Sequence, residues 1–323
     1  MGQEKRLTGV IDTCSQQFLK FFAGLCCFLF VVWGCKSPSV SSLATEQVFF
    51  RETDSYGREV ILATPPKRII SLSPCITEMI FELQSGNKLV GISDFCDYPT
   101  ETDTMTKVGG MLNFSIEHIL SLRPDIVLIG SIVQQNDVQK MEDAGLKVFA
   151  AREEQHLSGM YHTITLLGKM LQRDSLACEK VREWKSRIAS LDTLSGKMQT
   201  RPSVYYVVGF GNTGDYTAPK NSHIHEMITL AGGRNVGEPL SGWSVSREYL
   251  IQQNPDMIFI RQEDFKTFLN TKPYIYLSAV KNENVYPITS SWIDVSGPRN
   301  FWAIKMMNRK IKAWEHEQTM SIN

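Results

Sequence analysis

The residues best suited to covalent or metal chemistry in this sequence are its seven cysteines and six histidines. No two cysteines stand in Cys-x-x-Cys spacing, which argues against a zinc or thioredoxin-type site. His225 and Glu226 are adjacent but lack the His-Glu-x-x-His spacing of a zinc protease, and neither a GxxxxGK[ST] nor a GxSxG pattern occurs. We therefore expect no enzyme, no metal-ligand set and no resident cofactor.

The cysteines are distributed unevenly along the chain. Four of them come before residue 36, and the body holds only Cys75, Cys96 and Cys178. Cys75 and Cys96 follow the ends of two consecutive predicted strands, which a parallel sheet would place side by side. We therefore expect a disulfide between Cys75 and Cys96, provided that their Cα atoms lie within about 7 Å of each other.

The N-terminus carries an apolar run from Phe21 to Trp33, which is too short to cross a bilayer and is typical of an export signal. The run ends in Gly34-Cys35 and resembles a bacterial lipobox, whose cysteine is lipidated. We expect a lipid on Cys35, a membrane anchor and a folded part that faces the periplasm. Trp33 stands where a small residue is usual, so an ordinary cleaved signal or a short membrane anchor stays an alternative.

Apolar, β-branched runs alternate with helical segments along the body, which predicts βαβ units with mostly parallel sheets. A hairpin is expected over 47–63, with its turn at Tyr56-Gly57. A long charged helical stretch is expected over 157–194, interrupted around 172–174. The expected strands are 68–73, 88–93, 125–130, 147–151, 203–209, 256–261 and 285–289.

The body also contains an internal repeat. Ser115–Ile129 and Ser246–Ile260 match at Ser, Glu, an aliphatic residue, Pro-Asp and the following strand, with identical spacing. Ser115 and Ser246 can cap a helix, and Pro-Asp ends that helix before a buried strand. The repeat predicts two domains of one design.

The expected division places a signal peptide and a tether ahead of two α/β lobes that one helix links. The boundaries are 1–34 for the signal peptide, 35–46 for the tether, 47–170 for the first lobe, 171–197 for the linking helix and 198–323 for the second lobe.

Five motifs, in order along the chain, carry a family resemblance: Ser73–Glu78, Gly91–Pro99, Val108–Gly110, Leu122–Asp125 and Ala231–Asn235. Over roughly 68–311 the chain resembles the substrate-binding proteins of ABC importers for cobalamin, ferric siderophores and haem. The resemblance implies two Rossmann-like lobes with mostly parallel sheets, joined by a single long α-helix. It also implies small lobe movements and three partners: a metal chelate, a permease dimer with its ATPase subunits, and the membrane.

Within that family the chain resembles the cobalamin binder at Asp97-Tyr98-Pro99, at Trp243 and at Ser290–Arg299. Aromatic side chains suit a flat, apolar-faced macrocycle such as a corrinoid. Met111 and Ser291 depart from the Trp and the acidic residue of that binder, so a ferric siderophore or haem stays an alternative. The ligand residues that the resemblance implies are Phe95, Tyr98, Met111, Phe210, Tyr216, Trp243, Trp292 and Arg299.

The two repeated glutamates, Glu117 and Glu248, match the positions at which this family docks on its permease. A dimeric permease has its own twofold axis, so two like charges related by a pseudo-twofold can engage both subunits. The chain has 34 basic and 34 acidic side chains, which gives no general attraction to nucleic acid. An α/β enzyme with an interlobe active site is the alternative of another class, and a surface scaffold is a third.

Overall fold

The computed structural model describes residues 48–130, 132–151, 156–196, 198 and 200–322. The predicted signal peptide, the lipobox residue Cys35 and the tether over 35–46 lie outside the described residues. The chain separates into two units, Met1–Thr45 and Glu46–Asn323, and every described element belongs to the second unit. None of the described helices combines the length and the apolar character needed to cross a bilayer.

The first lobe is built on a parallel sheet with the strand order β4-β3-β5-β6. Its strands are short and almost wholly buried, as their apolar sequences predict. The strands are β3 (Ile69–Ser71), β4 (Leu89–Ile92), β5 (Ile126–Ile129) and β6 (Val148–Ala150). The expected hairpin precedes them as the antiparallel pair β1 (Phe50–Thr53) and β2 (Glu59–Leu62).

Helices cover both faces of this sheet, because successive residues of a strand point to opposite sides. Leu128 of β5 packs in one hydrophobic cluster with Met79, whereas Val127 packs in another with Ile119 and Met141. The helices that supply these side chains are α1 (Pro74–Glu82), α2 (Ile116–Ser121) and α3 (Gln135–Asp143).

The second lobe repeats the design with the parallel order β12-β11-β7-β9 and adds an antiparallel ribbon, β8-β10. Its strands are β7 (Ser203–Val207), β8 (Asp215–Tyr216), β9 (Arg234–Asn235), β10 (Ser244–Val245), β11 (Met257–Arg261) and β12 (Val285–Ile288). Its helices are α6 (His223–Leu230), α7 (Arg247–Gln253), α8 (Phe265–Leu269), α9 (Ser278–Lys281), α10 (Ser290–Ile293) and α11 (Asn300–Ile322).

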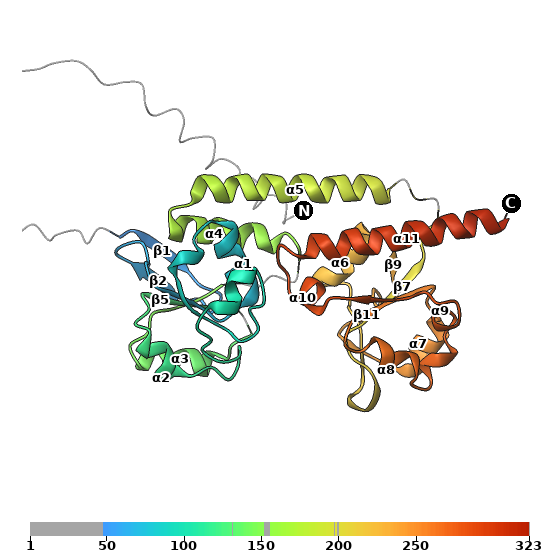
Figure 1. Ribbon diagram of the computed structural model, residues 1–323, viewed down its shortest axis with the longest axis horizontal. Coiled ribbons are helices and arrows are strands. Elements are labelled where there is room, and N and C mark those ends of the chain that lie inside the picture. Colours follow the sequence, from blue (N-terminus) through green and yellow to red (C-terminus); the bar gives the residue numbers. More distant parts are fainter. Residues whose placement is uncertain (1–47, 131, 152–155, 197, 199, 323) are drawn as a thin grey trace, which may run out of the picture. The chain divides into compact units, whose positions relative to one another are not determined.

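Two helices join the sheets: α4 (Gly159–Leu171) and α5 (Asp174–Ser195). The chain breaks between them at Gln172, which adopts a left-handed φ of 58° at the end of α4. Gly168 allows α4 and α5 to pack closely, since a Cβ there would lie 2.5 Å from the Cβ of Ala177. In Figure 1, α5 passes above both sheets. The two α/β lobes and the helical link confirm the predicted fold class.

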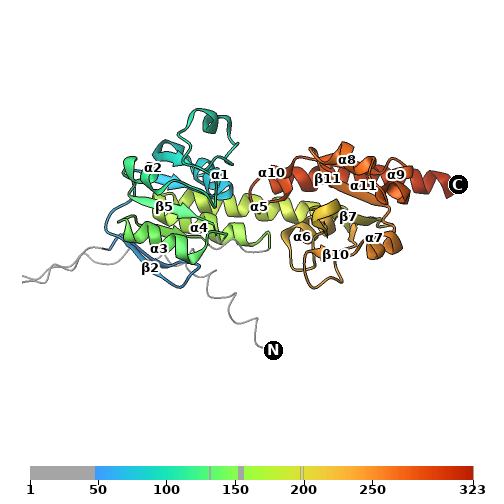
Figure 2. The same cartoon turned by 90° about the horizontal axis from the view of Figure 1, so that it is seen from below.

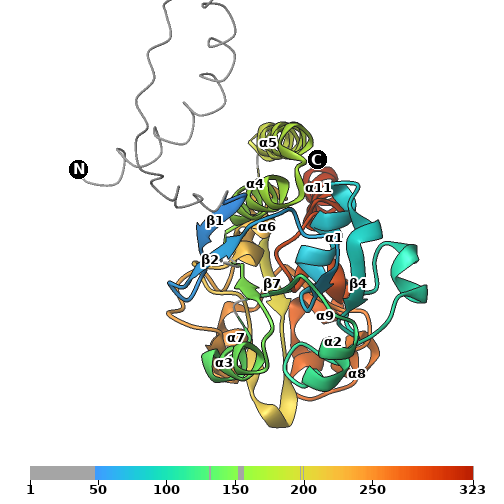
Figure 3. The same ribbon diagram turned by 90° about the vertical axis from the view of Figure 1, so that its left-hand side faces the viewer.

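The helices form two layers on either side of the strands. Figure 3 shows α4, α5 and α11 on one side and α2, α3, α7 and α8 on the other. Figure 2 shows the molecule from this second side, with α2 in the first lobe and α7 in the second.

The repeated units fold as the sequence predicts. The hydroxyl of Ser115 accepts a hydrogen bond from the His118 amide at 3.1 Å, and that of Ser246 accepts one from the Tyr249 amide, also at 3.1 Å. Each cap begins a short helix, α2 or α7, that leads into a central strand of its sheet.

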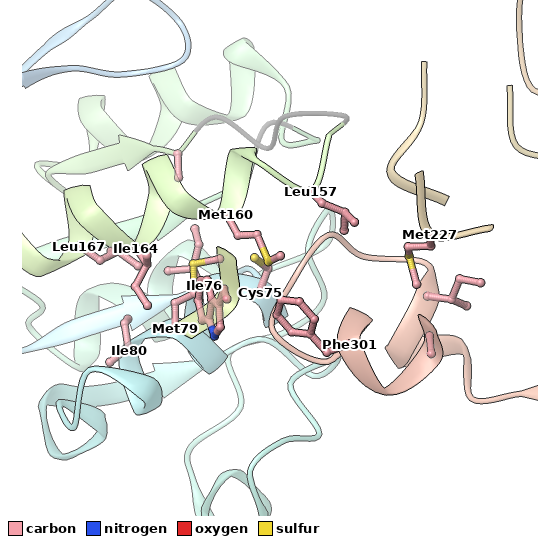
Figure 4. Close-up of a cluster of buried hydrophobic side chains, with 14 of the residues drawn as sticks. Cys75, Ile76, Met79, Ile80, Leu157, Met160, Ile164, Leu167, Met227 and Phe301 are labelled. Atoms are coloured by element: carbon pink, nitrogen blue, oxygen red, sulfur yellow. The ribbon is translucent and has the colours of Figure 1, made fainter. Parts of the chain in front are cut away.

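A single hydrophobic cluster extends from one lobe into the other. Cys75 of α1, with Leu157 and Met160 around the start of α4, lies in this cluster with Met227 of α6 and Phe301 of α11 (Figure 4). Because protein cores are close-packed, a continuous core between the lobes resists a wide hinge opening.

Candidate functional site

Arg299, one of the predicted ligand residues, joins the two lobes. It lies just before α11 and is 6% exposed. Its Nε donates to Oε1 of Glu78 on α1 at 2.9 Å, and its Nη2 donates to Oδ1 of Asp97, after β4, at 2.8 Å. Its Nη1 donates to the hydroxyl of Ser291 at 2.9 Å, within its own lobe. We call this cluster of Arg299, Glu78, Asp97 and Ser291 the seam.

Glu78 and Asp97 were not among the predicted site residues, and their contact with Arg299 was not predicted. Glu78 is separated from Arg299 by 221 positions along the chain, so no local pattern reports the contact. The signal that was present is the Glu at the end of the Ser73–Glu78 motif, because a carboxylate on the buried face of a helix requires a partner.

The carboxyl group of Glu78 titrates in an unusual range. Burial raises its pKa to about 7, and the hydrogen bond and charge of Arg299 oppose this rise without cancelling it. Its Oε2 atom is buried and has no hydrogen-bond partner among the described residues. Glu78 can therefore gain or lose a proton near neutral pH.

Three aromatic rings adjoin the seam. The guanidinium of Arg299 lies 5.2 Å from the ring centre of Tyr98. Tyr98 meets Trp302 edge-on at 5.3 Å, and Trp302 meets Trp292 at 5.5 Å. The structure thus brings together three predicted ligand residues, Tyr98, Trp292 and Arg299. It adds Trp302, which is 39% exposed and which the sequence places in the first turn of the terminal helix, between Phe301 and Ala303.

Phe95 and Met111 lie in the loop region that follows β4. The Asp94 amide donates to the Gly109 carbonyl at 2.9 Å, which ties the start of this region to its middle. A Cβ on Gly110 would lie 3.1 Å from the Phe95 ring, so the ring packs closely over that backbone. The Phe95 side chain is 59% exposed, which leaves most of its apolar surface available to a ligand.

Tyr216 and Trp243 lie together on the β8-β10 ribbon of the second lobe. The carbonyl of Trp243 accepts from the Thr217 amide at 2.8 Å, and Ser244 pairs with Tyr216 across the ribbon. Both aromatic side chains are 37% exposed. Tyr216 lies opposite Ser244, whereas Trp243 lies opposite Thr217, so the two aromatic side chains belong to opposite faces of the ribbon. Regular hydrogen bonds hold both residues in place.

Phe210 is more deeply placed than Tyr216 and Trp243. Its ring meets Phe268 edge-on at 5.2 Å and Tyr274 at 5.5 Å. The hydroxyl of Tyr274 donates to Oδ1 of buried Asp215 at 2.6 Å, and Arg247 lies 3.6 Å from Oδ2 of the same carboxylate. This network fixes the base of the ribbon and was not predicted.

The eight predicted ligand residues therefore form three groups. One adjoins the seam, one lies in the region after β4, and one lies on and beside the ribbon. Among the described residues, no aromatic ring pair joins the second group to the third.

The predicted docking glutamates are both exposed, each in the first turn of its helix. Glu117 accepts a hydrogen bond from the hydroxyl of Ser115 at 3.2 Å. Their helices, α2 and α7, both lie on the side of the strands away from α5 (Figures 1 and 3).

The expected disulfide is wrong, because Cys75 and Cys96 are not joined. The Cys96 sulfur lies 3.2 Å from the hydroxyl of Thr77. Cys75, at the start of α1, instead faces the cluster of Leu157, Met160 and Phe301 (Figure 4). The two strand ends are adjacent in the sheet, but their cysteines belong to different surroundings.

Histidines and acids do not form a metal cluster within the described part of the chain. His223 is buried, and its Nε2 lies 2.8 Å from the Ile293 carbonyl. Burial lowers the pKa of His223. His225 pairs with Asn235 at 3.2 Å, which places both histidines in structural roles.

The sequence of this chain matches a known protein family. The family model described as periplasmic binding protein matches residues 69–291. The chain belongs to the periplasmic binding protein family. This match confirms the resemblance that the order of the motifs predicted.

Individual relatives are similar over most of their length. An ABC transporter substrate-binding lipoprotein of Bacillus subtilis is 27% identical over 277 residues, which cover 82% of this chain and 88% of the relative. A vitamin B12-binding protein of Vibrio vulnificus is 25% identical over 249 residues, covering 76% and 90%. The apo structure of a periplasmic heme-binding protein from Roseiflexus superposes with a TM-score of 0.69 at 20% identity, covering 77% of this chain and 99% of that one.

Proposed function

We propose that this chain is the substrate-binding lipoprotein of an ABC importer, and that it captures a metal chelate between its lobes and delivers it to the permease. A corrinoid such as cobalamin is the ligand that we favour. The family match and the relatives named for ABC transport and for vitamin B12 support this proposal.

The observation that carries the ligand class is the set of large aromatic side chains left partly exposed in both lobes. Phe95, Tyr216 and Trp243 are 59%, 37% and 37% exposed. Rigid aromatic faces offer a large contact area to a flat macrocycle at low entropic cost.

Capture and release would involve small movements of the lobes. The shared core and the seam both oppose wide opening. We infer that the permease separates the lobes, with Glu117 and Glu248 engaging one subunit each. The ATPase subunits would then supply the energy for that step.

The membrane anchor is the second part of the proposal. We infer that Cys35 is lipidated and holds the protein on the membrane, facing the periplasm. Cys35→Ser should leave the protein soluble or unprocessed, because acyl chains provide much of the membrane affinity of a lipoprotein. Recovery of fully processed Cys35→Ser protein in the membrane fraction would contradict this.

Haem or a ferric siderophore is the second candidate ligand. The fold similarity to a heme-binding protein and the position of the Tyr216 phenol on the ribbon support haem. Incubation of the purified protein with cobalamin, haem and ferric siderophores separates these candidates, because each chromophore has its own absorption spectrum. The alternative of an enzyme has no support in the family match, and turnover assays beside calorimetry would test it.

The aromatic residues can be tested directly by calorimetry. Trp243→Ala should weaken chelate binding by about 1 to 3 kcal/mol, whereas Tyr276→Ala should not change it. Tyr276 is a suitable control because it is also aromatic, is 58% exposed and belongs to the same lobe. Equal affinity in both variants would remove Trp243 from the site.

A further inference from the structure

Side chains of α5, α10 and α11 line a groove. The helices α5 and α11 lie on the same side of the sheets (Figure 1). The volume of the groove is about 940 Å³, which is large enough for a drug-sized molecule. Apolar side chains from both helices and from α10 form much of its lining. They are Leu191, Trp292, Phe301, Trp302 and Met306.

Positive charges accompany this apolar lining. Lys305, Arg309 and Lys312 follow one another at helical spacing along α11, and Arg187 contributes from α5. Arg187 is paired with Glu183, but the three cations of α11 make no salt bridge with any described residue. None of the described lining residues is acidic.

An apolar groove with cations fixed along one wall suits a ligand with an apolar tail and an anionic head. Tryptophan and leucine beside lysine and arginine are also the composition of helices that bind at the membrane interface. A lysine or arginine near an anionic lipid surface contributes on the order of 1 kcal/mol each. A phosphate group can accept hydrogen bonds from several such side chains at once.

We propose that the groove between α5 and α11 binds an anionic phospholipid. Its phosphate lies against Lys305, Arg309 and Lys312, and an acyl chain packs along Leu191 and Trp302. The groove shares Trp292 with the residues predicted to bind the chelate, but lipid binding there does not depend on the identity of the chelate. Trp302 also contacts Tyr98, so the lipid borders the seam but does not enter it.

The test is a titration of the unit Glu46–Asn323, which contains all three described hydrophobic cores. Trp292 and Trp302 line the groove, so tryptophan emission should report binding. The probes are lysophosphatidylglycerol, which is anionic, and lysophosphatidylcholine, which is zwitterionic, both below their micelle concentrations. We expect the anionic probe to bind at least tenfold more tightly.

The double variant Arg309→Glu/Lys312→Glu should weaken binding of the anionic probe at least tenfold. The control Lys266→Glu/Lys281→Glu makes the same change in net charge on exposed residues of α8 and α9, away from the groove, and should bind within twofold of the parent protein. Equal binding of the two probes, or equal weakening in both variants, would overturn the proposal. Competitive displacement of the anionic probe by cobalamin or haem would also overturn it, because the groove would then be a chelate site.

Discussion

The two lobes share one local design, and Asp125 and Asp256 show how closely it is repeated. Asp125 Oδ2 accepts from the amides of Lys67 and Arg68 at 2.6 and 2.8 Å, at the start of β3. Asp256 Oδ2 accepts from the amide and the hydroxyl of Ser203 at 2.7 and 2.6 Å, at the start of β7. In each lobe the Pro-Asp of the repeat therefore fixes the beginning of the neighbouring strand.

The lobes differ where they touch each other. The first helix after the first sheet strand carries a glutamate in each lobe, Glu78 on α1 and Glu226 on α6. Glu78 is buried against Arg299, whereas the side chain of Glu226 is 33% exposed. Glu226 accepts from the Leu157 amide at 2.8 Å and pairs with His156 at 2.5 Å. The contact of Glu78 is therefore buried and sensitive to pH near neutrality, whereas the contact of Glu226 at the equivalent position is partly exposed to solvent.

The repeated segments therefore provide the scaffold, whereas segments outside the repeat provide the contacts that distinguish the two lobes. The β8-β10 ribbon, the Arg299 seam and the groove beside α11 all lie outside the matched segments. The repeat itself provides caps, strand anchors and the two exposed glutamates.

The largest effect should come from removing the two exposed glutamates of the repeat together. Glu117→Ala/Glu248→Ala should abolish uptake in reconstituted vesicles and leave chelate affinity unchanged, since neither residue belongs to the proposed ligand groups. Each single variant should retain part of the activity if both carboxylates dock. Normal uptake by the double variant, or a similar loss in a Glu101→Ala/Glu263→Ala control, would contradict the docking assignment.

The second prediction concerns the contrast between Glu78 and Glu226. The folded-state pKa of Glu78, about 7, lies above its ordinary value of 4.5, so the folded state keeps a proton that the unfolded state releases. Its contribution to stability is therefore complete below about pH 4.5 and is lost as the pH rises through about 7. The change should total on the order of 3 kcal/mol.

Urea unfolding between pH 4.5 and pH 8 tests this contrast. Glu78→Gln should flatten the pH dependence of the unfolding free energy over this range. Glu226→Gln should change the stability by less than about 1 kcal/mol, because its ion pair is partly exposed. The same pH profile in the parent protein and in Glu78→Gln would show that Glu78 does not titrate there.

The third prediction compares the two strand anchors. Asp256→Ala should lower the unfolding free energy by about 2 kcal/mol, because it leaves donors of Ser203 unsatisfied and Ser203 is only 6% exposed. Asp125→Ala should cost about 1 kcal/mol, because Lys67 and Arg68 are exposed and water can replace the carboxylate. A larger loss for Asp125→Ala would reverse the proposed ranking.

Much of the scaffold could be predicted from the sequence, because it depends on local patterns. Buried strands such as 126–129 and 257–260 are unbroken apolar runs, and Ser115 and Ser246 mark helix starts by their type and position. The break in the linking helices was also visible near Gln172.

The site was less predictable, because its contacts depend on tertiary placement. Glu78 meets Arg299 only after both lobes have folded, and the lining of the groove comes from α5 and from α10 and α11, which are far from α5 in the sequence. The failed disulfide has the same origin. Strand adjacency was predicted correctly, but the direction of each cysteine depends on what packs around it.

The smallest effect should come from the residue that ends each repeated helix. Arg123 and Asn254 occupy the same place before Pro-Asp, and both adopt left-handed backbone angles, with φ of 48° and 39°. The αR conformation is disfavoured before proline, and asparagine tolerates the left-handed region better than arginine does. Arg123→Asn should therefore raise the unfolding free energy by about 0.5 kcal/mol.

Arg123→Lys, which keeps a long cationic side chain, should leave stability unchanged. If Arg123→Asn destabilises the protein in thermal unfolding, then Arg123 makes a contribution in the first lobe that Asn254 does not make in the second, and the two units differ even in their scaffold.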